Sequence, residues 1–198
     1  MSSKEQLNRY NEKRDFNPSP EPEGENLKKN DKPIFVIQKH NASSLHYDFR
    51  IEVDGVLKSW AVPKGPSTDP SVRRLAIPTE DHPIEYANFE GVIPEDNYGG
   101  GEVIIWDNGN YENLKENNSP NIKESLEEGH ATIWLNGKKL KGGYALIRTT
   151  RGKNEKWILI KMKDEKSDAR RNPTNTENKS VVSGKTIKYL QENYDENK

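Results

Sequence analysis

The sequence predicts a mainly β protein, a small antiparallel β-barrel of roughly eight strands with one or two short helices and flexible termini. Short apolar runs rich in Val, Ile and aromatic residues follow one another from about residue 34 to residue 163. Asp-Gly and Asn-Gly pairs fall between several runs, and such pairs favour tight hairpins and therefore antiparallel neighbours. Many hairpin-linked strands in one small domain are typical of a closed or nearly closed barrel rather than a doubly wound sheet.

The composition indicates that part of the chain does not pack into a core. Of the 198 residues, 30% are hydrophobic and 32% are charged, which are low and high values for a compact domain. We therefore expect three segments. These are a mobile N-terminal arm at residues 1–32, the barrel domain at residues 33–163 and a C-terminal tail at residues 164–198.

Residue types and patterns that the sequence lacks exclude several classes of site and function. The chain has no cysteine, which excludes disulfides, thiolate catalysis and zinc-finger sites and leaves His, Asp and Glu as candidate metal ligands. No apolar run approaches the length of a membrane span and the first residues are polar, so we expect a soluble, cytoplasmic protein without membrane contact. The net charge of -1 gives no general affinity for nucleic acid, so any such contact must be local.

The elements follow in order along the chain. Residues 2–14 begin with serines that suit a helix cap but hold few apolar residues, and prolines keep residues 17–25 extended or disordered. Strand-like runs then occupy residues 34–39, 45–53, 56–62, 74–78, 102–106, 130–135, 138–141, 143–149 and 156–161. We expect turns at Asp54-Gly55, at residues 107–110 and at Asn136-Gly137.

Two helix patterns remain. Residues 119–129 have a capping serine, a proline at the first helical position and a terminating glycine, which together predict the one helix of the core region. Near the C-terminus, residues 186–192 form a second, short helix pattern.

Polar side chains alternate along the run at residues 45–53. Because successive side chains of a strand point to opposite faces, the polar residues share one face and the apolar residues share the other. The polar set is His46, Asp48, Arg50 and Glu52. His40, at the end of the preceding run, could complete a divalent-metal site with His46 and Asp48. The alternative is a half-buried strand whose polar residues face water. In a closed barrel an inward-facing row would line a pocket at the mouth. Because unpartnered buried charges are costly, the row must face solvent, pair internally, or hold an ion and a charged ligand.

A loop bounded by prolines carries a second polar set, formed by Glu80, His82 and Tyr86. Such a rigid connection suits a residue that is presented to a ligand, although a histidine beside a proline is often an ordinary surface residue.

Three cationic side chains could bind phosphate oxygens together. Lys64 lies in a rigid turn after the run at residues 56–62, and Arg50 and Arg74 lie on neighbouring runs. A lysine in such a turn is usually solvated. The three glycines at 99–101 indicate a tight bend or bulge rather than an anion-binding nest.

Together these residue types suit phosphoryl chemistry, because a metal ion and cations offset the charge of the transferred group. One alternative is a non-haem iron oxygenase with His46, Asp48 and His82 as its facial triad, which gives no task to Lys64 or the arginines. A second alternative is a non-catalytic module that binds nucleic-acid ends, in which the histidines only stabilise the fold.

Several linked motifs resemble one known family. They are His40-N-A-S-S-L-His46-Y-Asp48-F-Arg50, A-V-P-Lys64-G-P-S, L-A-I-P-T-Glu80-D-His82-P-I-E-Tyr86 and Y-G-G-G-E-V. They are similar to the 3′-phosphoesterase domain at the amino end of bacterial DNA ligase D, which also occurs as a free-standing protein in bacteria and archaea. The resemblance runs from about Tyr10 to Thr186.

The resemblance implies a manganese-dependent β-barrel hydrolase, with other divalent cations as alternatives, that acts on the 3′ ends of primer-template nucleic acid. It would remove a terminal ribonucleoside to leave a 3′-phosphate and hydrolyse that phosphate to a 3′-hydroxyl, preparing ends for non-homologous end joining. The chain length indicates the stand-alone form, so a ligase or polymerase partner would be a separate chain.

Residue roles also follow from the resemblance, position by position. The metal ligands would be His40, His46 and Asp48. The catalytic set would be Arg50 and His82, which contact the scissile phosphate, with Tyr86 in support and Lys64 in the polar shell around them. The substrate-binding set would be Gln38, Arg74, Glu80, Arg14 and Asp15, of which the last two match a motif that closes over the substrate.

Overall fold

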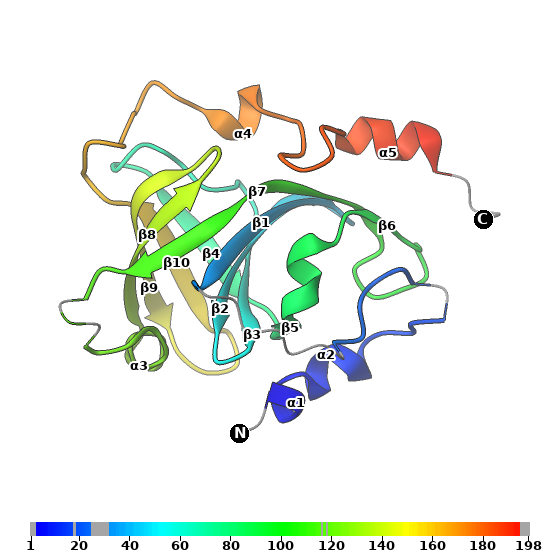
Figure 1. The fold of residues 1–198 in the computed structure, drawn as a ribbon, viewed down its shortest axis with the longest axis horizontal. Coiled ribbons are helices and arrows are strands. Elements are labelled where there is room, and N and C mark those ends of the chain that lie inside the picture. Colours follow the sequence, from blue (N-terminus) through cyan, green and yellow to red (C-terminus); the bar gives the residue numbers. More distant parts are fainter. Residues whose placement is uncertain (1–2, 18, 25–31, 116, 118, 195–198) are drawn as a thin grey trace.

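A computed structural model describes residues 3–17, 19–24, 32–115, 117 and 119–194. Eight of its strands form a closed antiparallel barrel in the order β1-β2-β3-β4-β10-β9-β8-β7, and pairing between β1 and β7 closes the circle (Figure 1). The strands are β1 (Ile34–Asn41), β2 (Leu45–Val53), β3 (Val56–Val62), β4 (Arg73–Pro78), β7 (Gly101–Asn113), β8 (His130–Gly137), β9 (Lys141–Thr150) and β10 (Lys156–Lys161). The predicted fold class is confirmed.

Shorter elements surround the barrel. β5 (His82–Pro83) pairs with β3, and β6 (Gly91–Ile93) pairs with β7. The helices are α1 (Ser3–Gln6), α2 (Asn8–Glu12), the 3₁₀ helix η1 (Ile84–Asn88), α3 (Ile122–Glu128), α4 (Pro173–Thr176) and α5 (Ile187–Asn193). Among the described residues, none of these helices has the length and apolarity needed to cross a membrane.

The tight hairpin between β2 and β3 is confirmed. Val53 pairs with Val56, and the two turn residues have positive φ angles, 51° at Asp54 and 82° at Gly55. Positive φ at both central positions matches the right-handed twist of the flanking strands, and this is why Asp-Gly is favoured there.

The turn predicted at residues 107–110 is wrong, because β7 runs unbroken from Gly101 to Asn113. The register with β1 slips at this point, where Ile37 faces Asp107 while the next residue, Gln38, faces Ile105. The extra residue is a β-bulge, which bends a strand without ending it. The buried Asp107 carboxylate accepts hydrogen bonds from three backbone N–H groups of the β8–β9 connection, at 2.8–2.9 Å.

Two further boundaries differ from the sequence prediction. β8 continues through Gly137, so the turn lies at residues 138–140 rather than at Asn136-Gly137. Helix α3 is capped by Asn121, whose side chain accepts from the Glu124 backbone, instead of beginning at Ser119. Glycine at 129, with a φ of 92°, ends this helix as predicted.

The core has two parts on opposite sides of the same strands. The apolar face of β2 points into the barrel, where Tyr47, Phe49 and Ile51 join one cluster of buried side chains. The second cluster lies outside the barrel wall, between β1, β3, β7, η1 and the N-terminal segment. The polar face of β2 therefore points outward beneath a second layer, and the predicted pocket at the mouth of the barrel is wrong.

The chain ends pack against the barrel where the structure describes them. Leu7 and Tyr10 of the N-terminal segment are buried in the second cluster. Residues after β10 run over the barrel on the side of α4, where the Trp106 indole N–H donates to the Glu177 carbonyl at 2.6 Å. The predicted short C-terminal helix is confirmed as α5, capped by Thr186. Mobility of residues 1–32 stays a prediction.

Candidate metal centre and anion site

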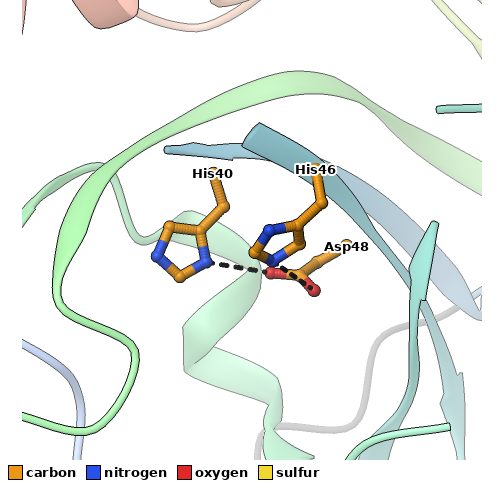
Figure 2. Close-up of side chains that lie close together, drawn as sticks. All are labelled: His40, His46 and Asp48. Carbon is orange, nitrogen blue, oxygen red and sulfur yellow. Dashed lines mark ion pairs between the residues drawn. The ribbon is translucent and has the colours of Figure 1, made fainter. Parts of the chain in front are cut away.

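Two adjacent strands bring together the three residues predicted as metal ligands. His40 on β1 pairs directly with His46 on β2, and Asp48 lies two residues further along the same face. His40 Nδ1 is 3.4 Å from Asp48 Oδ2, and His46 Nε2 is 3.6 Å from Asp48 Oδ1 (Figure 2). One ligand atom from each residue lies within 4.8 Å of the others. The trio is therefore confirmed as a group that could hold a metal ion.

Hydrogen bonds to backbone carbonyls orient both imidazoles for this task. His40 Nε2 lies 2.8 Å from the Gly99 carbonyl, and His46 Nδ1 lies 2.9 Å from the Ser44 carbonyl. Because a carbonyl only accepts, these nitrogens carry ring hydrogens, and the other nitrogen of each ring, which faces Asp48, is the one that would bind a metal ion. This arrangement fits a metal site, since ligating histidines usually donate their second N–H to such a partner.

The glycine-rich bend contributes to the same site. Gly99 has a φ of 78° and supplies the carbonyl that fixes His40. Gly101 has a φ of 135°, and a side chain there would collide with the Asn41 backbone at the end of β1. The three glycines thus form the predicted tight bend, which lets β7 begin directly against the metal trio.

A buried arginine connects the trio to the second polar set. Arg50 donates from Nη2 to Asp48 at 3.0 Å and from Nε to Gln38 at 2.8 Å, and its Nη1 lies 3.0 Å from His82 Nδ1. Burial alone would raise the pKa of Asp48, but Arg50 and then the two histidines lower it below its usual value. Asp48 therefore remains a carboxylate, as a metal ligand must.

His82 lies between two guanidinium groups. Its Nδ1 is 2.9 Å from the Glu80 carbonyl, and its Nε2 is 3.2 Å from Nη2 of Arg14. Arg14 can only donate, so Nε2 accepts from it, while Nδ1 faces both the Glu80 carbonyl and the Nη1 donor of Arg50. Burial, followed by Arg50 and Arg14, holds the pKa of His82 well below its usual value.

The N-terminal segment completes this side of the site. Arg14 donates to Glu80 Oε1 at 3.0 Å and to Glu21 Oε1 at 2.9 Å. Tyr86 also donates to Glu21 Oε1, at 3.0 Å, and burial followed by Glu21 raises the Tyr86 pKa so that its hydroxyl stays protonated. Sequence reasoning missed Glu21, because it lies in a proline-broken segment without periodicity.

Three predicted site residues are not joined to this cluster by the described contacts. Lys64 is exposed. Arg74 lines a different cavity, beside Arg171. Asp15 is exposed, and its carboxylate accepts from the backbone and side chain of Asn17. The roles of these three residues stay predictions. Gln38, Glu80, Tyr86 and Arg14, by contrast, all lie in the network around Arg50 and His82.

The triad expected for an oxygenase, His46, Asp48 and His82, differs from the trio that the structure brings together. His82 has both ring nitrogens occupied, by Glu80 and the two arginines, so it does not join His46 and Asp48. The third member of the trio is His40. Two histidines and a carboxylate still suit several divalent metals, including manganese, iron and zinc.

Comparison with known proteins shows the family to which this barrel belongs. The family model described as the DNA Ligase D 3′-phosphoesterase domain matches residues 38–148. The chain belongs to this family.

Its curated relatives are much longer proteins. The chain is 51% identical to the multifunctional non-homologous end joining protein LigD of Pseudomonas aeruginosa, over 83% of this chain and 19% of that protein. It is 45% identical to the multifunctional non-homologous end joining DNA repair protein LigD of Mycobacterium tuberculosis, over 82% of this chain and 20% of that protein. The chain thus spans about a fifth of the length of these relatives.

If the metal trio binds a cation, the cation should stabilise the folded protein. We expect a divalent cation to raise the free energy of unfolding, by about 2.7 kcal/mol at a concentration 100 times its dissociation constant, because only the folded chain gathers the ligands. His46→Ala should abolish this gain, as measured by thermal unfolding with and without a panel of divalent cations. His130→Ala, a change at an exposed histidine on β8, should leave it intact. Equal stabilisation of both variants would contradict the assignment.

Proposed function

We propose that the protein is a manganese-dependent phosphoesterase that processes the 3′ ends of primer-template nucleic acid for non-homologous end joining. It removes a terminal ribonucleoside and hydrolyses the remaining 3′-phosphate to a 3′-hydroxyl. The observation that carries the proposal is the contact of Arg50 with both Asp48 and His82, because it joins a candidate metal trio to a candidate anion site in a chain of this family.

Each residue around the reacting phosphate would have a separate role in the reaction. Manganese held by His40, His46 and Asp48 would act as a Lewis acid toward a phosphate oxygen. Arg50 would bind the scissile phosphate, and the neutral imidazole of His82 would accept or relay a proton, because its pKa rises when a phosphate offsets the two guanidinium charges. Tyr86 would support both side chains, since the Arg50 guanidinium lies 5.0 Å from its ring and the His82 ring lies 4.7 Å away.

The remaining residues would form the substrate-binding shell. Gln38 orients Arg50, while Glu80 orients Arg14 and, through its carbonyl, His82. Lys64 and Arg74 would serve the nucleic acid backbone further from the reacting phosphate. The segment with Arg14 and Asp15 would close over the bound 3′ end. A ligase or polymerase would seal or extend the 3′-hydroxyl.

The central test uses a labelled primer-template that ends in a 3′-phosphate or in a short ribonucleotide tail. With manganese, the wild-type protein should release phosphate and remove the terminal ribonucleoside, and His46→Ala should lose both activities while keeping its fold. Product analysis on a gel gives the result. Full activity of the variant in chelator would refute the metal assignment.

The same assay separates the two alternative functions. A shift in primer mobility without new products would indicate a module that only binds nucleic-acid ends. Turnover only with iron, oxygen and an oxo-acid would indicate an oxygenase.

A matched pair of arginine substitutions tests the role of the N-terminal segment. Arg14→Ala removes the guanidinium that contacts His82 and Glu80, so the rate of phosphate release should fall about tenfold or more. Arg9→Ala, at an exposed position on α2, should change the rate less than twofold. Equal rates for both variants, measured at saturating substrate, would show that Arg14 is not part of the site.

A further inference from the structure

The loop between β6 and β7 carries an exposed aromatic ring beside the candidate site. Tyr98 is 49% exposed and belongs to neither of the two clusters of buried apolar side chains. The next residue in the chain, Gly99, supplies the carbonyl that contacts the ring of His40. Tyr98 is therefore fixed close to the metal trio, with much of its ring open to a ligand from solvent.

Side-chain contacts place the Tyr98 ring beside the anion site as well. Lys13 Nζ lies 4.5 Å from the centre of the ring and donates to the Tyr98 hydroxyl at 3.2 Å. The same ammonium group pairs with Glu80 at 3.1 Å. The Arg14 guanidinium lies 5.6 Å from the ring centre, and its Nη2 lies 3.2 Å from His82 Nε2. One arginine side chain thus lies between the Tyr98 ring and the histidine assigned to proton transfer.

Hydrogen bonds give this loop a fixed shape. The Asn97 N–H donates to the Pro94 carbonyl and the Gly100 N–H donates to the Asn97 carbonyl, both at 3.0 Å. A side chain at Gly100 would collide with the backbone of the same loop. The Asn97 side chain donates to the Asp15 carbonyl at 3.1 Å, which joins the loop to the N-terminal segment (Figure 1). A ring held on such a loop loses little conformational freedom when it binds a ligand.

The charges around Tyr98 favour a nucleobase over a phosphate as its ligand. Glu95 and Asp96, on the same loop, are both exposed, and carboxylates repel a nucleic acid backbone. Lys13, the exposed cation beside the ring, already pairs with Glu80. Stacking on an aromatic ring needs no charge, because every nucleobase presents a π face. The ring therefore suits the uncharged part of a nucleotide.

We propose that Tyr98 stacks on the base of the nucleotide whose 3′ oxygen carries the reacting phosphate. One ribose joins this base to the phosphate, so a phosphate beside Arg50 and His82 leaves its own base within reach of a ring that lies one arginine away. The inference rests on the proposed function. It identifies how the enzyme holds 3′ ends of any sequence, since stacking does not select one base.

Single abasic nucleotides test which base is contacted. A series of 3′-phosphate primers on one template carries an abasic nucleotide at the terminal position or at one of the preceding positions, and KM and kcat for phosphate release are measured with manganese. The terminal abasic nucleotide should raise KM about fivefold or more, near the lower end for one lost stacking contact, while the other positions should change KM less than twofold.

The outcomes of this series are distinguishable. A flat series with normal turnover, or a rise in KM confined to another position, would overturn the stacking contact and leave the proposed function standing. Absence of turnover on every primer would overturn the proposed function, and the inference with it.

Variants at Tyr98 assign the effect to the ring. On the intact primer, Tyr98→Ala should raise KM about fivefold or more. Tyr98→Phe keeps the ring and loses only the hydroxyl that contacts Lys13, so its KM should stay within about twofold of the wild-type value. Tyr189→Ala, at a tyrosine of similar exposure (46%) on α5, is the matched control and should also leave KM unchanged.

The variant and the abasic primer together separate stacking from a structural role. If Tyr98 contacts the terminal base, Tyr98→Ala should give KM values for the terminal abasic primer and the intact primer that lie within about twofold of each other. If Tyr98 only fixes the loop that contacts His40, the variant should lose kcat on both primers and keep the full abasic penalty in KM. The second result would contradict the proposal.

Discussion

The buried guanidinium of Arg50 is the group on which the site depends. Its three nitrogen atoms contact Asp48, Gln38 and His82, and the Arg50 residue is 3% exposed. An arginine so buried is tolerated only when partners compensate for its lost hydration, since an unpaired buried charge costs several kcal/mol. The carboxylate that satisfies Arg50 is also a candidate metal ligand. One side chain therefore links the metal trio to the histidine that would face the substrate.

The barrel places this network on its outer wall. The apolar side chains of β2 fill the barrel, while the alternate side chains project into the layer formed by η1 and the N-terminal segment. The cluster is charged and lies outside the apolar core, so it needs a cover that brings its own polar partners. Arg14, Glu21 and Tyr86 provide them. The same segment is thus both part of the packing and part of the candidate site.

Much of this architecture could be predicted from local patterns. Alternation along β2 predicted which side chains share a face, and Asp54-Gly55 predicted the hairpin. The Asn108-Gly109 pair led to the wrong prediction of a turn. Pairing with β1 along β7 outweighs the turn preference of these two residues. The contact of Glu21 with Tyr86 and the separation of Arg74 from Arg50 depend on contacts between distant segments. No spacing rule in the sequence expresses such contacts.

The coupling between the metal trio and the anion site is tested most directly by the affinity for Mn²⁺ with and without inorganic phosphate, at fixed free ion concentrations. If Arg50 joins the two sites, phosphate should tighten Mn²⁺ binding about fivefold or more, and phosphate binding should be tightened by the same factor. Arg50→Lys should reduce this factor below about twofold, because an ammonium group does not reproduce the fork that contacts Asp48 and Gln38. Equal Mn²⁺ affinity with and without phosphate in the wild-type protein would contradict the account.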